Sequence, residues 1–303
     1  KMIHNNLYLM IFLLLLSCSS KPLKNPYVIV LGTTQDGGAP HAGCNKKCCV
    51  KRWSNSKKEF FVTSLGIVDP NSNEAWMIDA TPDFPYQHNQ LSKDNKIKGI
   101  FITHAHIGHY AGLMYLGRET MGYKNMPLYT APKMTKYLQT NGPWSQLIDL
   151  KNVKINRIKE DKEVVLNKRL TIKPFIVPHR DEFSETVGYK INGPQKSLIF
   201  IPDIDKWNKW NVDVLEVISD NEFALLDGTF FNNGEVAGRD MSEIPHPFIV
   251  ESIEYFEKIK NNVEISFIHF NHTNPLLNPD SDLRKKLNNQ GYGATFLNQK
   301  FEL

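Results

Sequence analysis

The chain carries three histidines within six residues: His104, His106 and His109. The apolar run from Gly99 to Ile102 precedes them and predicts a buried strand, and the segment from Tyr110 to Leu116 follows and predicts the start of a helix. A loop between a strand and a helix with this spacing can direct several imidazoles at one point. Because imidazole is the commonest protein ligand of zinc, the cluster predicts a metal site rather than three unrelated loop histidines.

Length and composition are those of a soluble globular protein. The 303 residues are 41% hydrophobic and 22% charged, and no long Pro, Gly or Ser linker divides them. We therefore predict one domain over residues 26–303, with two sheets and helices outside them. The net charge of +4 comes from scattered lysines without a basic run, so no nucleic-acid partner is expected.

The N-terminal segment has the pattern of a secretory signal. The stretch from Leu7 to Leu16 is almost entirely apolar, too short to span a bilayer but suited to a signal-peptide core. It ends in Leu15-Leu16-Ser17-Cys18, which resembles the lipobox of bacterial lipoproteins. This resemblance implies a signal peptide over residues 1–18, a lipid on Cys18, a tether over 19–25 and a location in the bacterial cell envelope. A buried N-terminal strand or helix is the alternative.

Strand-rich and mixed regions follow one another along the chain. Their apolar, β-branched and aromatic runs predict strands at Tyr27–Leu31, Phe60–Val68, Ala75–Ile78, Ile100–Ile102, Leu128–Thr130, Leu170–Val177, Val187–Ile191, Ser197–Ile201, Phe223–Leu226 and Ile265–Phe270. Helices are expected at Ala111–Leu116, Lys133–Thr140, Pro247–Lys260 and Asp280–Asn289.

Three later strands each end in a side chain that can bind metal: His179, Asp203 and His269. The order of a histidine cluster, a single His, a single Asp and a final His resembles the metallo-β-lactamase superfamily over nearly the whole mature chain. The resemblance implies an α/β fold, the αββα metallo-β-lactamase sandwich, in which two mixed β-sheets carry helices on their outer faces. It also implies a site for two metal ions in the loops.

Carried over by position, the resemblance assigns the ligands. His104, His106 and His179 would hold a first zinc, while His109 and His269 would hold a second, and Asp203 would bridge the two; Asp205 is the alternative bridge in the same loop. Where the family has an aspartate between the second and third histidines, this chain has Gly108. We therefore expect a weaker second site or a different metal there. The candidates to compensate are Asp205, Asp181 and Asp83.

The segment from Leu31 to Cys44 resembles two branches of that superfamily, coenzyme PQQ synthesis protein B and phosphodiesterases of cyclic phosphate sugars. Both branches hold a structural zinc with cysteines here, spaced Cys-x-Cys-x-x-Cys. This chain has Cys44, Cys48 and Cys49 instead, an odd number that cannot all pair in disulfides. The resemblance implies a structural zinc on these three cysteines and His272. Alternatively, His272 caps the turn that follows it.

Two further residues are expected to take part in catalysis. In the phosphodiesterase branch a histidine in the position of His246 protonates the leaving alkoxide, and Asp227 would orient or stabilise that region. The alternative for His246 is a residue beside the start of the next helix. Arg180, Lys206 and Arg239 are cations in candidate active-site loops that can meet a small anionic substrate.

These features favour a zinc-dependent hydrolase that cleaves a phosphoester or a similar small anionic ester with a metal-bound hydroxide. The alternatives are a protein like coenzyme PQQ synthesis protein B, acting oxidatively on a peptide or quinone precursor, and a non-catalytic metal-binding homologue. The metal content of the purified protein separates the three classes.

Overall fold

The computed structural model describes residues 24–55, 59–236, 238, 240–241 and 243–303. The expected signal peptide with Cys18, and the tether up to residue 23, lie outside these residues. None of the helices in the described part is long and apolar enough to cross a membrane.

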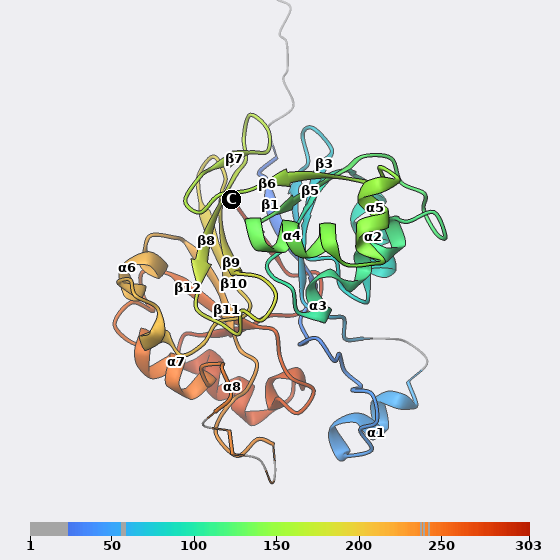
Figure 1. The fold of residues 1–303 in the computed structure, drawn as a ribbon. Coiled ribbons are helices and arrows are strands. Elements are labelled where there is room, and N and C mark those ends of the chain that lie inside the picture. Colours follow the sequence, from blue (N-terminus) through green and yellow to red (C-terminus); the bar gives the residue numbers. More distant parts are fainter. Residues whose placement is uncertain (1–23, 56–58, 237, 239, 242) are drawn as a thin grey trace, which may run out of the picture.

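Two seven-stranded sheets form the centre of the described chain (Figure 1). The first sheet has the order β14 (Lys300–Glu302), β1 (Tyr27–Gly32), β2 (Ser64–Asp69), β3 (Glu74–Ile78), β4 (Lys96–Phe101), β5 (Met126–Thr130) and β6 (Val153–Arg157). The second has the order β13 (Gly293–Ala294), β12 (Glu264–Ile268), β11 (Phe223–Asp227), β10 (Ser197–Ile201), β9 (Thr186–Asn192), β8 (Thr171–Val177) and β7 (Val164–Val165).

Helices cover the outer faces of both sheets (Figure 1). Those beside the first sheet are α2 (Phe84–Ser92), α3 (Ile107–Tyr110), α4 (Pro132–Thr140) and α5 (Trp144–Asp149), with a 3-10 turn at Ala111–Leu116. Those beside the second are α6 (Val214–Ser219), α7 (Ile249–Phe256) and α8 (Asp282–Asn289), with 3-10 turns at Trp207–Lys209 and Pro275–Leu277. Helix α1 (Lys47–Trp53) lies apart from both groups. The predicted αββα sandwich is confirmed.

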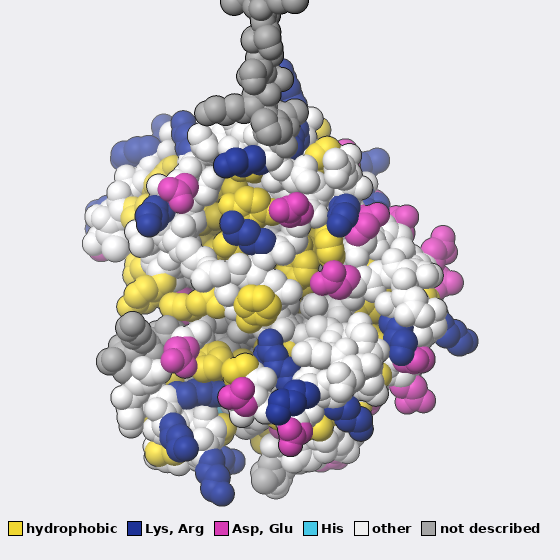
Figure 2. Space-filling model, turned by 180° about the vertical axis from the view of Figure 1, so that it is seen from behind, with side chains coloured by type: hydrophobic (Ala, Val, Ile, Leu, Met, Phe, Trp, Pro, Cys, Tyr) yellow, Lys and Arg dark blue, Asp and Glu magenta, His cyan; other side chains and the backbone are white. Residues whose placement is uncertain are grey.

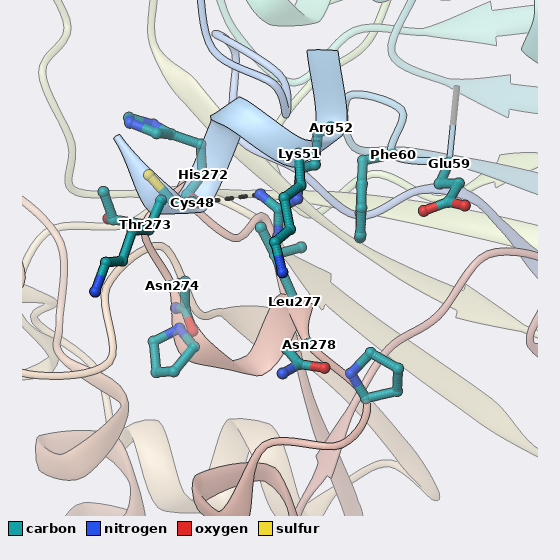
Figure 3. A pocket seen from close by; sticks show the side chains of 13 residues that line it. Cys48, Lys51, Arg52, Glu59, Phe60, His272, Thr273, Asn274, Leu277 and Asn278 are labelled. Carbon is teal, nitrogen blue, oxygen red and sulfur yellow. Dashed lines mark hydrogen bonds between the residues drawn. The ribbon is translucent and has the colours of Figure 1, made fainter. Parts of the chain in front are cut away.

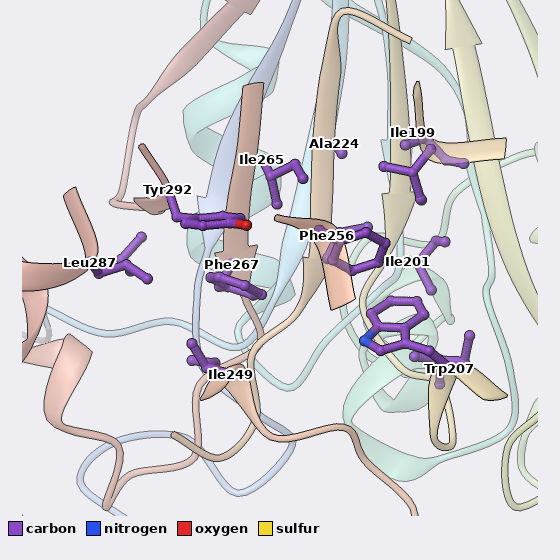
Figure 4. Packing of buried hydrophobic residues seen from close by; sticks show 14 of the residues in the cluster. Ile199, Ile201, Trp207, Ala224, Ile249, Phe256, Ile265, Phe267, Leu287 and Tyr292 are labelled. Carbon is purple, nitrogen blue, oxygen red and sulfur yellow. The ribbon is translucent and has the colours of Figure 1, made fainter. Parts of the chain in front are cut away.

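Three apolar layers hold the sandwich together. Side chains of both sheets, among them Phe101 and Tyr189, fill the space between them. A second layer joins the first sheet to its helices. The third joins the second sheet to α6, α7 and α8, where Trp207 lies edge-on to Phe256 beside Ile201 (Figure 4). Each buried aliphatic or aromatic side chain stabilises the fold by about 1.5–3 kcal/mol relative to exposure, so these layers fix the loops at the strand ends.

Several predicted boundaries are wrong for local reasons. The strand expected from Phe60 begins at Ser64, because the carbonyl of Phe61 accepts hydrogen bonds from Thr33 and Thr34 across a loop. The strand expected to reach Phe270 ends at Ile268, where His269 turns into the left-handed region with φ of 68°. The helix expected over Pro247–Lys260 is limited to Ile249–Phe256, and α1, α2, α5 and α6 were not predicted.

The sheet topology brings the candidate site residues to one rim. Strands β3 and β4 are parallel, as are β10, β11 and β12. Strand β8 runs in the same direction as β10, because both are antiparallel to β9. The carboxyl ends of these strands therefore open at the same edge, where loops of both sheets meet.

Candidate metal centre

Three histidines from two sheets form the first cluster. His104 and His106 follow β4 and His179 follows β8, and one ring nitrogen of each lies within 4.8 Å of the others. The Nε2 atom of His106 lies 3.0 Å from Glu182 Oε2, which leaves Nδ1 as the ring nitrogen available to a metal. The structure thus brings together the three residues expected at the first zinc.

A second cluster consists of His109, His269 and an aspartate that the sequence analysis did not select, Asp36. His109 lies on the short helix α3 and His269 directly follows β12. The Oδ1 atom of Asp36 lies 3.2 Å from His109 Nε2 and 3.5 Å from His269 Nε2. The second cluster therefore contains a carboxylate of its own.

Asp203 lies between the two clusters. Its Oδ2 atom is 3.0 Å from His109 Nε2 and 3.2 Å from His269 Nε2, while its Oδ1 atom is 3.8 Å from His179 Nε2. Oδ2 also lies 4.0 Å from His104 Nε2, so the carboxylate stands between nitrogens of both clusters, the placement expected of a bridging ligand. The alternative, Asp205, is engaged elsewhere, since its Oδ2 atom pairs with Lys209 Nζ at 2.8 Å.

An aspartate and a threonine stand behind the histidines of the first sheet. Thr103 Oγ1 donates to the Asp79 carboxylate at 3.0 Å and lies 3.0 Å from His104 Nδ1, from which it can accept. His109 Nδ1 donates directly to Asp79 Oδ2 at 2.7 Å. These contacts place a ring proton on each Nδ1 and direct each Nε2 toward the centre.

The second sheet repeats this arrangement. Thr229 Oγ1 donates to Asp227 Oδ1 at 2.7 Å and lies 3.0 Å from His269 Nδ1. Asp227 Oδ2 accepts a hydrogen bond of 2.7 Å from His246 Nδ1. An aspartate at the end of each sheet therefore orients two histidines, one directly and one through a threonine hydroxyl.

Two residues of the centre hold a backbone conformation that side chains disfavour. Asp79 has a φ of 67° and His269 a φ of 68°. Such residues cost about 1–3 kcal/mol each and persist where surrounding contacts fix them. Here the strand end of β3 and the strand end of β12 turn sharply so that these side chains face the rim.

Unpartnered buried atoms test whether the residues suit a metal ion. Of nine buried side-chain nitrogens and oxygens without a hydrogen bond in the described part of the chain, seven belong to this centre. They are His104 Nε2, His109 Nε2, His269 Nε2, both ring nitrogens of His179, Asp36 Oδ1 and Asp203 Oδ2. Leaving such atoms unpaired costs about 1–3 kcal/mol each, so a set that converges on one place fits bound cations.

The electrostatics also favour cations. Burial opposes charge on Asp203, but His269 and His109 outweigh it and hold the pKa of that carboxyl well below its usual range. The pKa of Asp36 is likewise lowered, because His109 and His269 outweigh the effect of burial. Burial lowers the pKa of His179 to about 4, which keeps its ring neutral and able to bind a metal.

His246 lies beside the centre and lines a pocket of about 320 Å³. Its Nδ1 is held by Asp227, so Nε2 is the ring nitrogen free to exchange a proton. Burial lowers the pKa of His246, but Asp227 more than offsets this and the pKa is raised above its ordinary value. Arg180 lines the same pocket, where its Nη1 atom lies 3.5 Å from Glu182 Oε1. Lys206 Nζ pairs with Glu251 at 2.7 Å, and Arg239 lies outside the described residues.

The cysteines gather with His272 at a separate place. One ligand atom each of Cys44, Cys48, Cys49 and His272 lies within 4.8 Å of the others, despite the changed cysteine spacing. His272 Nδ1 can donate to Asn271 Oδ1 at 3.1 Å, which leaves Nε2 for a metal. Figure 3 shows Cys48 beside His272, whose carbonyl accepts a hydrogen bond of 3.2 Å from Arg52.

The protonation of this cysteine cluster suits a metal that displaces protons. Desolvation and the neighbouring sulfurs raise the pKa of Cys48 to about 11, and burial lowers the pKa of His272 to about 4. The histidine is therefore neutral at pH 7 and the Cys48 thiol is protonated until a cation takes the proton's place.

The expectation that Gly108 leaves the second cluster without a carboxylate of its own is wrong. None of the three proposed compensators fills the gap: Asp205 pairs with Lys209, Asp181 accepts from Thr186, and Asp83 accepts from the backbone of Val62. Asp36 lies there instead. The only sequence signal for it was an acidic residue in the Gly-rich segment after β1, together with the missing aspartate at position 108.

Comparison with known proteins identifies the family. A family model described as the β-lactamase superfamily domain matches residues 76–270, which is more than half of the chain. The chain belongs to this superfamily. Coenzyme PQQ synthesis protein B of Acinetobacter baumannii (strain SDF) is 22% identical over 311 residues, covering 91% of this chain and 100% of the relative.

Solved structures of superfamily members share the fold. Zinc-bound PqqB from Methylobacterium extorquens superposes with a TM-score of 0.77 at 22% identity, covering 91% of this chain and 100% of its own. A diphosphatase from the PhnP family superposes with a TM-score of 0.68 at 22% identity, covering 93% and 98%. The chain thus has the metallo-β-lactamase fold, with histidine and aspartate clusters suited to zinc or another divalent metal.

Proposed function

We propose that the protein is a zinc-dependent hydrolase of a phosphoester or a similar small anionic ester. The observation that carries the proposal is the joining of two metal-ligand clusters through Asp203, beside a histidine and aspartate pair at a pocket. Two divalent ions held by these clusters would activate water and neutralise charge that develops on the ester oxygens. The superfamily includes hydrolases, and the PhnP-family neighbour is named as a diphosphatase.

The residues of the chain have distinct tasks in this reaction. Asp79 and Thr103 hold the Nε2 atoms of His104 and His109 toward the centre, and Thr229 does so for His269. Arg180, half exposed at the pocket, offers a cation to an anionic substrate. His246, oriented by Asp227, gives a proton from Nε2 to the leaving oxygen.

Two esters with different leaving groups distinguish proton donation by His246 from a role in substrate binding alone. The zinc-loaded protein should hydrolyse both a p-nitrophenyl phosphodiester and an alkyl phosphodiester. In His246→Gln we expect the alkyl rate to fall by about 10²–10⁴-fold, the usual contribution of a general acid. The p-nitrophenyl rate should fall far less, because p-nitrophenolate leaves without a proton.

His41→Gln is the matched control, since His41 lines the same pocket but does not contact Asp227. It should leave the ratio of the two rates unchanged. Absence of hydrolysis of either ester by zinc-loaded protein, across a range of such esters, would contradict the proposal. An equal loss on both esters in His246→Gln would remove the general-acid role.

A second candidate is oxidative chemistry on a peptide or quinone precursor, as in a protein like coenzyme PQQ synthesis protein B. The similarity over 91% of this chain and the full length of that relative favours it. It predicts one iron per chain in the purified protein and no hydrolysis of phosphodiesters, whereas the first candidate predicts two zinc ions in the histidine centre.

A further inference from the structure

Asp36 fills the space that a side chain at position 108 would need. A Cβ atom built on Gly108 would lie 2.4 Å from Asp36 Oδ1 and 2.6 Å from Asp36 Cα. Contacts this short do not occur between non-bonded atoms, and the second one involves backbone that cannot swing aside. A side chain at position 108 therefore excludes the observed position of Asp36, and Asp36 in turn requires a glycine there.

The carboxylate of Asp36 faces the second cluster. Its Oδ1 atom is buried, makes no hydrogen bond and lies within 3.5 Å of both His109 Nε2 and His269 Nε2. Those two nitrogens are themselves buried without hydrogen bonds. Three buried ligand atoms without a hydrogen bond thus lie close together, and Asp79 and Thr229 hold the two imidazole rings in place.

The backbone before Asp36 is tied to the strand end that carries His269. Gln35 N donates to the Phe270 carbonyl at 2.9 Å, and Phe270 N donates to the Thr33 carbonyl at 2.8 Å. A turn with a 2.7 Å hydrogen bond from Gly38 N to the Gln35 carbonyl follows at once. Asp36 thus stands on a short, paired segment, and the same pairing fixes its position relative to His269.

We propose that Asp36, on the loop after β1, supplies the carboxylate ligand of the second metal, and that the lack of a side chain at Gly108 leaves room for it. The ligand set of this cation is then Asp36, His109 and His269 with Asp203 shared. A cation there would be held as tightly as in a site with the carboxylate on the histidine loop. The inference rests on the metal centre of the proposed function but not on the reaction that the centre catalyses.

A swap of the carboxylate between the two positions tests this. The variants are Asp36→Asn, Asp36→Gly, Gly108→Asp and the double variant Asp36→Gly with Gly108→Asp. Zinc binding is measured by competition with a chelator, and bound zinc is counted per folded chain. Asp36→Asn and Asp36→Gly should weaken one zinc of the histidine centre by at least about tenfold, since even residues that only support a metal ligand contribute that much.

Gly108→Asp alone should not tighten any site and should weaken the second, because the new side chain meets Asp36. The double variant should regain most of the affinity that Asp36→Gly loses. Asp205→Asn is the matched control, since Asp205 pairs with Lys209 and should leave all zinc affinities unchanged. The circular dichroism spectrum of every variant checks that the chain is folded.

Unchanged affinity in both single Asp36 variants would overturn the proposal. So would tightening of the second site in Gly108→Asp with Asp36 present. If Asp36→Gly does not fold, a double variant that folds and binds both ions supports the proposal, and one that folds with a single ion in the histidine centre overturns it. Because zinc is counted directly, a protein that binds both ions but hydrolyses no ester contradicts the proposed function alone.

Discussion

At the scale of single residues, four histidines of the centre depend on an oxygen behind them. Asp79 and Asp227 hold one histidine each directly, and Thr103 and Thr229 connect each aspartate to another. A metal-binding ring whose Nδ1 proton is held this way presents Nε2 in one orientation. Loss of such an oxygen is therefore expected to change binding or proton transfer while the fold stays intact.

Asp227→Asn tests this at His246. Asp227 raises the pKa of His246 by stabilising the protonated ring, so its loss should lower that pKa. A general acid works only while protonated, so activity falls as pH rises through its pKa. In Asp227→Asn the falling limb of the kcat profile should therefore move to lower pH.

The measurement is the pH profile of kcat on an alkyl phosphodiester for the wild type and Asp227→Asn. Asp205→Asn is the control, because the Asp205 carboxylate pairs with Lys209 and is not a partner of His246. An alkaline limb that stays in place in Asp227→Asn would show that Asp227 does not set the protonation of His246.

The order of the histidines and of Asp203 along the chain predicted most of the histidine centre, but it did not predict Asp36. His179 and Asp203 lie two residues after the ends of their strands, so their convergence follows from the directions of those strands. Asp36 lies in a segment that resembles a glycine-rich turn, and nothing local marks its carboxylate as a ligand. Its role depends on the space above Gly108, which is a property of three-dimensional packing.

At the scale of elements, the loop between β1 and α1 carries both kinds of candidate metal site. Asp36 lies near its start, and the cysteines lie at its end on and before α1. The segment after β12 also reaches both sites: His269 faces the histidine centre, and His272, three residues later, faces the cysteines. Helix α1 is also attached through Arg52, which donates to the His272 carbonyl and lies over the ring of Phe60 at 4.5 Å.

Cys49→Ser should therefore remove one zinc and lower the melting temperature. The binding free energy of a structural zinc is part of the folding free energy, so its loss destabilises the loop and α1. Zinc content and thermal unfolding are the two measurements, with Lys51→Ala on the exposed side of α1 as the control. Unchanged zinc content and melting temperature in Cys49→Ser would show that no metal binds there.

The unpredicted helices α1 and α2 show why some elements escape sequence patterns. Helix α1 is seven residues long, and its Val50 and Trp53 are exposed, so it lacks an apolar stripe. Helix α2 begins with Phe84 and Pro85 and buries Gln87, whose amide donates to the Val62 and Leu31 carbonyls. Both helices depend on contacts with distant loops, which a periodicity of apolar residues does not reveal.

At the scale of the whole molecule, the two sheets gather the candidate site at one rim. On the face in Figure 2, basic and acidic side chains are interspersed over the surface. The single domain over residues 26–303 and the lipid anchor on Cys18 remain predictions, the second of them outside the described residues.

The anchor is tested by labelling. Expressed with its leader in a bacterium, the wild type should incorporate a labelled fatty acid and partition into detergent, and Cys18→Ser should do neither. Cys44→Ser controls for loss of a cysteine elsewhere in the chain. Label on Cys18→Ser, or none on the wild type, would contradict lipidation at Cys18.

Anomalous diffraction at the zinc edge, from crystals of the zinc-loaded protein, shows whether the centre binds two metals with Asp36 as a ligand. We expect two peaks on opposite sides of the Asp203 carboxylate, with Asp36 Oδ1, His109 and His269 around one of them, and a third peak among Cys44, Cys48, Cys49 and His272. A single peak at His104, His106 and His179, with the Asp36 carboxylate bound only to protein, would contradict this expectation.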